Sequence, residues 1–173
     1  MKLEKTFKCE NKKLYFLNDS KELSAQKIPL VKADDFIKGS MPDAALFAIG
    51  ITFKQIGNED EGYNEEFLAF LRDALKLLEE KHIFTFIIPL AEEEINAGRS
   101  EEVTASFKHC ARRIKDCTNL AGFALAKGID KALFISELSA KHEQYVFFST
   151  QGEDSSLVEY SLSDKETSKN CNF

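Results

Sequence analysis

The alternation of apolar runs with amphipathic segments constrains the fold of this chain more than any other feature. Four short runs are apolar without polar alternation, which is typical of strands buried on both faces. They cover residues 44–53, 83–90, 121–126 and 145–149. Apolar residues recur at helical spacing between the runs, in segments 65–82, 100–117 and 130–142. We therefore predict an α/β fold with a mostly parallel sheet of four to six strands, built from βαβ units as a three-layer sandwich or a partial barrel.

The predicted helices carry start signals in their sequences. Asn64 is a good N-cap, and Glu65 and Glu66 follow it in the first turn, where the helix dipole favours acidic side chains. Ser100 and Asp130 are the expected caps of the next two helices.

Cys110 and Cys117 are expected on the apolar stripe of the second predicted helix, as free thiols too far apart for a disulfide. Cys9 and Cys171 complete the set, and nothing in the pattern supports their pairing.

The segments that flank these units are shorter. Two apolar pieces, 6–9 and 14–17, predict a hairpin, and residues 34–38 predict one helical turn. Near the end, the pattern of residues 157–162 predicts an antiparallel strand that returns along one sheet edge. We expect a single domain over residues 1–173, with residues 163–173 as a flexible tail.

Composition restricts the function classes. The chain has 173 residues and carries 23 Lys and Arg against 29 Asp and Glu, for a net charge of −6. This acidic balance argues against nucleic acid as a partner. No apolar run approaches the roughly 20 residues of a membrane span, and the N-terminal residues lack the apolar stretch of a secretory signal. We therefore expect a cytoplasmic protein that does not enter a membrane.

The ends of the predicted strands are the first place to look for a site, because parallel α/β folds build their sites there. The most suggestive cluster is Glu92, Glu93 and Glu94, from which one carboxyl group acting with Glu59 or Asp60 would give an acid/base pair. A solvated acidic loop is the simpler interpretation of both clusters. The expected ligand-binding residues at these ends are Lys54, Tyr63, Asn96, Arg99 and Lys127.

Motifs for metals and cofactors are missing from the sequence. The three histidines, His82, His109 and His142, lack zinc-site spacing, and the glycines form no phosphate-binding loop. We therefore predict no metal and no cofactor. Arg112 and Arg113, with Lys108 and Lys115 beside them, are interpreted as one solvated helix face.

Three passages within 44–149 together resemble part of a cellulase-like (β/α)8 glycoside hydrolase. They are 45–53 with its acidic loop, 63–68 leading to 78–89, and 107–120 leading to 121–128. The last is similar to the helix and strand that present the family's acid/base glutamate after an asparagine. This chain has Lys127 and Gly128 at those two positions, and it is shorter than the roughly 250 residues of a full barrel.

The resemblance implies a shortened, non-hydrolytic relative. Our first hypothesis is a non-catalytic domain that binds a sugar-like small molecule or a protein. The alternatives are a small hydrolase that acts on glycosides through strand-end carboxylates, and a homo-oligomeric structural protein such as a homodimer.

Overall fold

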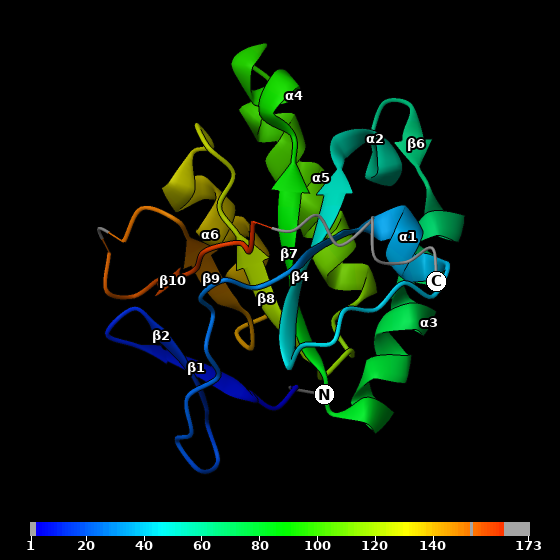
Figure 1. The fold of residues 1–173 in the computed structure, drawn as a ribbon. Coiled ribbons are helices and arrows are strands. Elements are labelled where there is room, and N and C mark those ends of the chain that lie inside the picture. Colours follow the sequence, from blue (N-terminus) through cyan, green and yellow to red (C-terminus); the bar gives the residue numbers. More distant parts are fainter. Residues whose placement is uncertain (1–2, 153, 165–173) are drawn as a thin grey trace.

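A computed structural model describes residues 3–152 and 154–164 of the chain. A six-stranded sheet forms its centre, and every pair of neighbouring strands in this sheet is parallel (Figure 1). The strands lie side by side in chain order: β3 (Leu30–Lys32), β4 (Leu46–Thr52), β7 (Phe84–Leu90), β8 (Leu120–Ala124), β9 (Val146–Ser149) and β10 (Val158–Glu159). This confirms the predicted α/β fold. A parallel sheet in chain order is typical of a segment of a (β/α) barrel.

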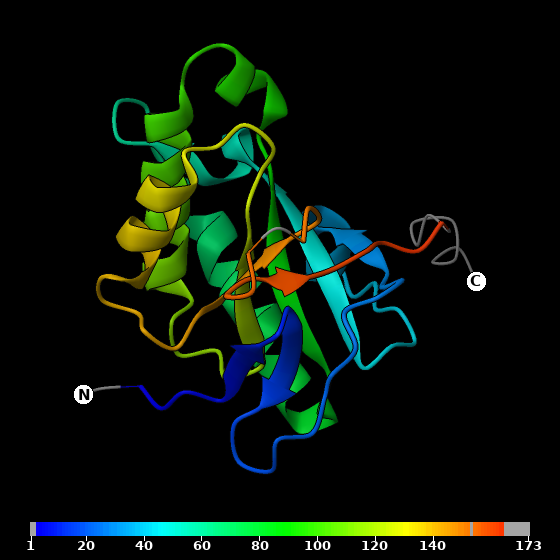
Figure 2. The ribbon, with the colours of Figure 1, turned by 90° about the vertical axis from the view of Figure 1, so that its left-hand side faces the viewer.

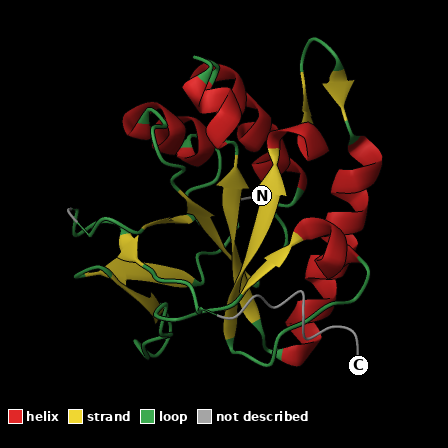
Figure 3. Ribbon diagram, turned by 45° about the horizontal axis from the view of Figure 1, so that its top comes forward, coloured by secondary structure: helices red, strands yellow, loops and turns green. Residues whose placement is uncertain are grey.

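Helices pack against one face of this sheet, and Figure 3 shows them gathered along one side of the strands. Three of them are long enough to fill a crossover between strands. The helices are α1 (Ala33–Ile37), α2 (Phe53–Ile56), α3 (Glu65–Lys81), α4 (Glu92–Asn96), α5 (Ser100–Arg113) and α6 (Lys131–Ser139). The predicted caps of α3 and α6 are confirmed, because Asn64 and Asp130 each accept a hydrogen bond from a first-turn amide.

The sheet is buried on both faces, which is why its strands are apolar without alternation. In β7, Ile87 packs toward the helices, whereas Phe86 and Ile88 pack on the other side. In β9, Phe147 and Phe148 divide in the same way. The alternating direction of strand side chains thus supplies two separate cores.

An antiparallel hairpin covers part of the second face, as the N-terminal pattern predicts. It consists of β1 (Phe7–Glu10) and β2 (Lys13–Phe16), and it lies across the sheet from the helices (Figure 2). Phe7, Phe16 and Phe84 meet with ring centroids 5.0–5.4 Å apart, at the start of β7. This aromatic cluster attaches the hairpin to the sheet.

The last strand corrects the sequence prediction, because β10 runs parallel to β9 and not antiparallel. A tight hairpin joins antiparallel strands, so it cannot connect β9 to β10. Leu157 is buried in the core on the helix side, and Val158 is buried on the opposite side. Alternate strand side chains face opposite sides, and a parallel neighbour requires the chain to return past β9 before β10 begins.

The start and end of α5 also differ from the prediction. Arg99 holds the N-cap position without a side-chain cap, and Ser100 Oγ instead accepts from the amide of Asp130. The helix ends at Arg113, so Cys117 lies in the following turn. Cys9, Cys110 and Cys117 are free thiols, as expected.

Several outer features complete the fold. A second small hairpin joins β5 (Gly57–Asn58) to β6 (Gly62–Tyr63). Phe70 is half-exposed on α3, where Leu77 follows it two turns later.

Within the described residues, no helix has the length and apolar character needed to cross a bilayer. The predicted tail lies outside the described residues from position 165 onward.

A pair of glycine substitutions tests the tight contact between β8 and β9. A Cβ at Gly122 would lie 1.6 Å from the carbonyl oxygen of Val146, whereas a Cβ at Gly50 would meet side-chain atoms of Leu90, at 2.8 Å, and of Leu30, at 3.4 Å. Backbone cannot yield as a leucine can, so we expect Gly122→Ala to lower the free energy of unfolding by at least about 3 kcal/mol. Gly50→Ala should cost less than about 1.5 kcal/mol. Urea unfolding of both variants measures the difference, and equal losses would contradict this packing.

Candidate functional site

A cleft opens where the central strands end, at the edge of the sheet predicted to carry a site. Its volume is about 570 Å³, within the range of small-molecule sites. Residues at the ends of β4, β7, β8, β9 and β10 line it. They are Thr52, Lys54, Ile88, Pro89, Leu90, Ala91, Glu92, Glu93, Glu94, Leu125, Ala126, Lys127, Thr150 and Tyr160.

Local capping fixes the wall of the cleft that follows β4. Thr52 Oγ1 accepts a hydrogen bond from the amide of Gln55, and the Gln55 side chain accepts one from the amide of Thr52. This reciprocal pair starts α2 immediately after the strand. It holds the turn that carries Lys54, whose exposed side chain stands on the rim.

Tyr160 contributes a buried aromatic ring to the floor of the cleft. It is 7% exposed and packs edge-on against Phe86, with ring centroids 5.1 Å apart. Its hydroxyl makes no hydrogen bond to a described residue. If this hydroxyl were shielded from solvent, it would be a buried polar atom without a hydrogen bond. Among the described residues, Thr104 Oγ1 is the one such side-chain atom, so the Tyr160 hydroxyl is in contact with solvent. Burial raises the pKa of Tyr160 to about 12, so this hydroxyl keeps its proton at neutral pH and can donate it.

The charges around the cleft are unevenly placed. Glu92, Glu93 and Glu94 all come from the first turn of α4, after β7. Within the described chain, no other element brings a carboxylate to this cleft. The neighbouring strand β8 is followed by Lys127, and β9 by Thr150. The cleft is therefore acidic where α4 begins, cationic after β8 and neutral after β9.

A smaller recess of about 190 Å³ adjoins the cleft and shares Lys127 and Thr150 with it. Asp154 lines this recess and forms an ion pair with Lys131 at 3.3 Å. Hydrogen bonds from Ser156, followed by the ion pair, hold the pKa of Asp154 at about 2. This carboxylate is therefore ionised and already has hydrogen-bond and ion-pair partners within the fold.

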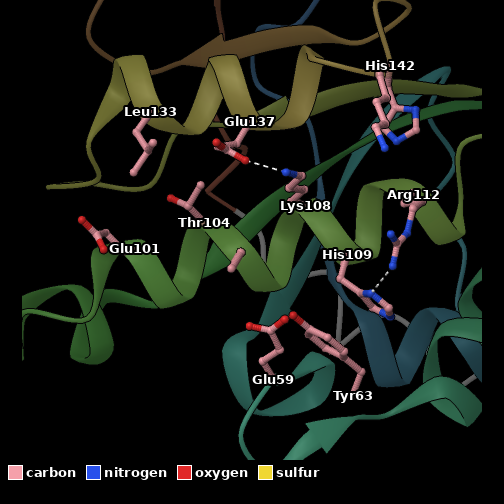
Figure 4. Close-up of a pocket in the computed structure, with 12 residues that line it drawn as sticks. Glu59, Tyr63, Glu101, Thr104, Lys108, His109, Arg112, Leu133, Glu137 and His142 are labelled. Carbon is pink, nitrogen blue, oxygen red and sulfur yellow. Dashed lines mark hydrogen bonds and ion pairs between the residues drawn. The ribbon is translucent and has the colours of Figure 1, made fainter.

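A second cavity, which we call the α5–α6 groove, lies on the outer side of the helices, between α5 and α6 (Figure 4). Its volume is about 530 Å³, and Glu59 and Tyr63 of the β5–β6 hairpin close one side. Ser106 Oγ donates to the carbonyl of Gly57 at 2.7 Å and ties the hairpin to α5. Thr104, 2% exposed, lines this groove with its unpartnered hydroxyl.

His109 connects this hairpin to α3 and α5. Its ring stacks on Tyr63, with centroids 3.7 Å apart and planes 6° from parallel. Nε2 lies 2.7 Å from Glu65 Oε1, and Nδ1 lies 3.1 Å from an Arg112 nitrogen. Because arginine only donates, Nδ1 accepts and Nε2 carries the proton toward Glu65. Arg113 adds a cationic contact to the same carboxylate.

The structure thus divides the predicted site residues between two places. Glu92, Glu93, Glu94, Lys54 and Lys127 meet at the strand-end cleft, whereas Glu59 and Tyr63 lie at the helix groove.

The other predicted site residues line neither cavity. Asp60 and Asn96 are exposed. Arg99 lies 4.9 Å above the Phe53 ring and pairs with Glu102. The hypothetical pair of an α4 glutamate with Glu59 or Asp60 is therefore not gathered around one cavity.

Sequence reasoning missed Tyr160, which it treated only as a strand residue. Its position just after an edge strand was the available signal, and the direction of that strand was predicted incorrectly.

These features define an α/β protein with a barrel-like parallel sheet and an open strand-end cleft. Comparison with solved structures agrees on the fold. The crystal structure of a GH5_18 protein from Bifidobacterium longum subsp. infantis superposes with a TM-score of 0.50 and 8% identity, over 72% of this chain. The chain spans 42% of the length of that protein. No family model and no curated protein matches the sequence.

Within the described residues, no group of three or more histidine, cysteine or acidic side chains is arranged to hold a metal ion. The predicted cofactor-free and metal-free site stays a prediction.

The Glu65 ion pairs give a pH-dependent prediction. Burial would raise the pKa of Glu65, but hydrogen bonds from His109 and Arg113 outweigh it and lower the pKa below 4.5. Since the native pKa is lowered, the carboxylate contributes stability above its unfolded pKa, and this is lost as pH falls through the native value. We expect Glu65→Gln to cost less than about 1 kcal/mol near neutral pH, because the side chains of Glu65 and Arg113 are 45% and 51% exposed, and nothing in acid.

Urea unfolding at both pH values measures this difference. The matched control is Glu66→Gln, which removes a neighbouring exposed carboxylate and should change stability little at either pH. An undiminished cost of Glu65→Gln in acid would contradict the electrostatic account.

Proposed function

We propose that this chain is a non-catalytic binding domain whose strand-end cleft takes a sugar-like ligand. The observation that carries the proposal is the Tyr160 hydroxyl, a protonated donor on an apolar floor that lacks a hydrogen bond within the described chain. Sugars offer both apolar ring faces and hydroxyl groups. A ring that packs over Ile88 and Leu125 would place its hydroxyls within reach of polar side chains on the rim.

The rim supplies complementary polar groups. Lys54 and Lys127 can donate hydrogen bonds, the α4 glutamates can accept them, and Thr52 and Thr150 can do both. Sugar hydroxyls use donors and acceptors together, so a mixed rim suits an uncharged polyhydroxylated molecule better than a simple anion or cation.

The placement of carboxylates argues against hydrolysis. Cleavage of a glycosidic bond by two carboxyl groups needs them on opposite sides of that bond. Here the carboxylates that line the cleft come from one turn of α4, and β8 is followed by Lys127 and Gly128. The likeness to a GH5_18 structure supports the fold of such a domain and not the activity.

Calorimetry with glucose, mannose, cellotetraose and mannotetraose tests the proposal. We expect at least one saccharide to bind, and we expect Tyr160→Phe to weaken its affinity about fivefold to tenfold, because one hydrogen bond is lost while the ring stays. Lys127→Ala should weaken it by a similar factor. Tyr15→Phe, at a tyrosine of β2 outside the cleft, is the matched control.

Three outcomes would overturn the proposal. They are the absence of binding across the panel, binding that is insensitive to both cleft variants, and release of shorter saccharides. If the last occurs, Glu→Gln variants at Glu92, Glu93 and Glu94 will show whether the hydrolase alternative is correct.

A further inference from the structure

The basic residues of α5 and its following turn do not form one solvated face. Lys108 pairs with Glu137 of α6 at 2.6 Å, and Arg113 is held by Glu65. In contrast, neither Arg112 nor Lys115 forms an ion pair with a carboxylate of the described chain. Two of the four cations singled out in the sequence are thus neutralised within the fold, and two are left over.

A third unpaired cation reaches the same place from the other helix. Lys141 follows α6, and it lines with Arg112 and Lys115 a cavity of about 710 Å³. Glu143 is the one described carboxylate that lines this cavity, and it lies on the exposed rim. Three cationic side chains, from α5, the turn after it and the segment after α6, therefore line one cavity with a single described carboxylate.

His142 forms the inner part of this cavity. It is 6% exposed, its ring hydrogen-bonds to the backbone of Lys141, and it packs edge-on against Tyr145 with centroids 5.8 Å apart. Figure 4 shows His142 and Arg112 on facing elements of the groove. Burial lowers the pKa of His142, the charges of Lys115, Arg112 and Lys141 lower it further, and together they outweigh the opposing hydrogen bond to the Lys141 backbone. The imidazole is therefore neutral near pH 7, surrounded by three positive groups.

We propose that Arg112, Lys115, Lys141 and His142 form a binding site for a phosphate or sulfate group. Such a tetrahedral dianion accepts several charge-assisted hydrogen bonds at once, and it would relieve the repulsion among the three cations. The site is separate from the strand-end cleft, since the two share no lining residue.

The surroundings restrict the ligand to a compact anion. The cavity continues into the α5–α6 groove, where Glu59, Glu101 and Glu137 lie farther along (Figure 4). An extended polyanion such as nucleic acid would meet these carboxylates, whereas inorganic phosphate, sulfate or a small phosphomonoester would not.

Binding of the anion should also favour protonation of His142. A dianion beside His142 would offset the charges of Arg112 and Lys115 on one side and of Lys141 on the other, and would raise the pKa of His142. Anion affinity should therefore increase as pH falls toward the range where His142 titrates, because the protonated ring becomes a further donor.

NMR titration of the imidazole signals with sodium phosphate and sodium sulfate tests the site. We expect saturable binding of both anions with a shift of the His142 signals, and an upward shift of the pKa of His142 by sulfate, which does not itself titrate in this pH range. A titration with glucose 6-phosphate distinguishes a free anion from a phosphomonoester as the preferred ligand, by comparison with inorganic phosphate.

Charge-matched variants separate a specific site from general attraction. The double variant Arg112→Gln with Lys115→Gln should weaken phosphate binding at least about tenfold. The control Lys38→Gln with Lys81→Gln removes the same charge at exposed positions outside this cavity and should not change the affinity. Absence of binding, a His142 pKa that sulfate leaves unchanged, or equal losses in both double variants would overturn the proposal.

Discussion

Burial of both faces of the parallel sheet is the constraint on which the rest of this structure depends. Each central strand sends alternate side chains to opposite sides, so neither face can be left to solvent. Helices cover one side. On the other, Phe86 and Phe148 stack with centroids 3.9 Å apart and planes 4° from parallel, between the hairpin and the last strand. In a closed barrel this second face would line the interior; here, the β1–β2 hairpin and Tyr160, just after β10, pack against it.

The position of the cleft follows from this cover. The hairpin is anchored at Phe84, where β7 begins, whereas the cleft is lined from Ile88 onward, where β7 ends. Tyr160 lies between the two regions, since it packs on Phe86 and also lines the cleft. The second face is thus filled at one end and open at the end where parallel folds carry their sites.

Much of the fold was predictable because it depends on local pattern. Uninterrupted apolar runs identified the central strands, and Asn64 and Asp130 marked two helix starts. The direction of β10 was not predictable, because the apolar pattern of residues 157–162 indicates a strand but not the direction in which it pairs with its neighbour.

The site was predictable to a similar extent. The rule that strand ends converge brought Lys54 and Lys127 to one cleft. It misplaced Tyr63, because the β5–β6 hairpin carries this residue away to α5, where His109 stacks on it. The meeting of Lys115 with Lys141 depends on how α5 packs against α6, and spacing along a single helix does not contain that information.

The central claim is that the strand-end cleft is a ligand site. The most direct test is backbone amide NMR of the labelled chain during titration with cellotetraose and mannotetraose. The account predicts saturable shifts for one of them, concentrated at Thr52, Lys127 and Thr150 around the cleft, while amides of α5 and α6 stay unchanged. Spectra that stay unchanged with both saccharides, or shifts concentrated on the helix side, would contradict it.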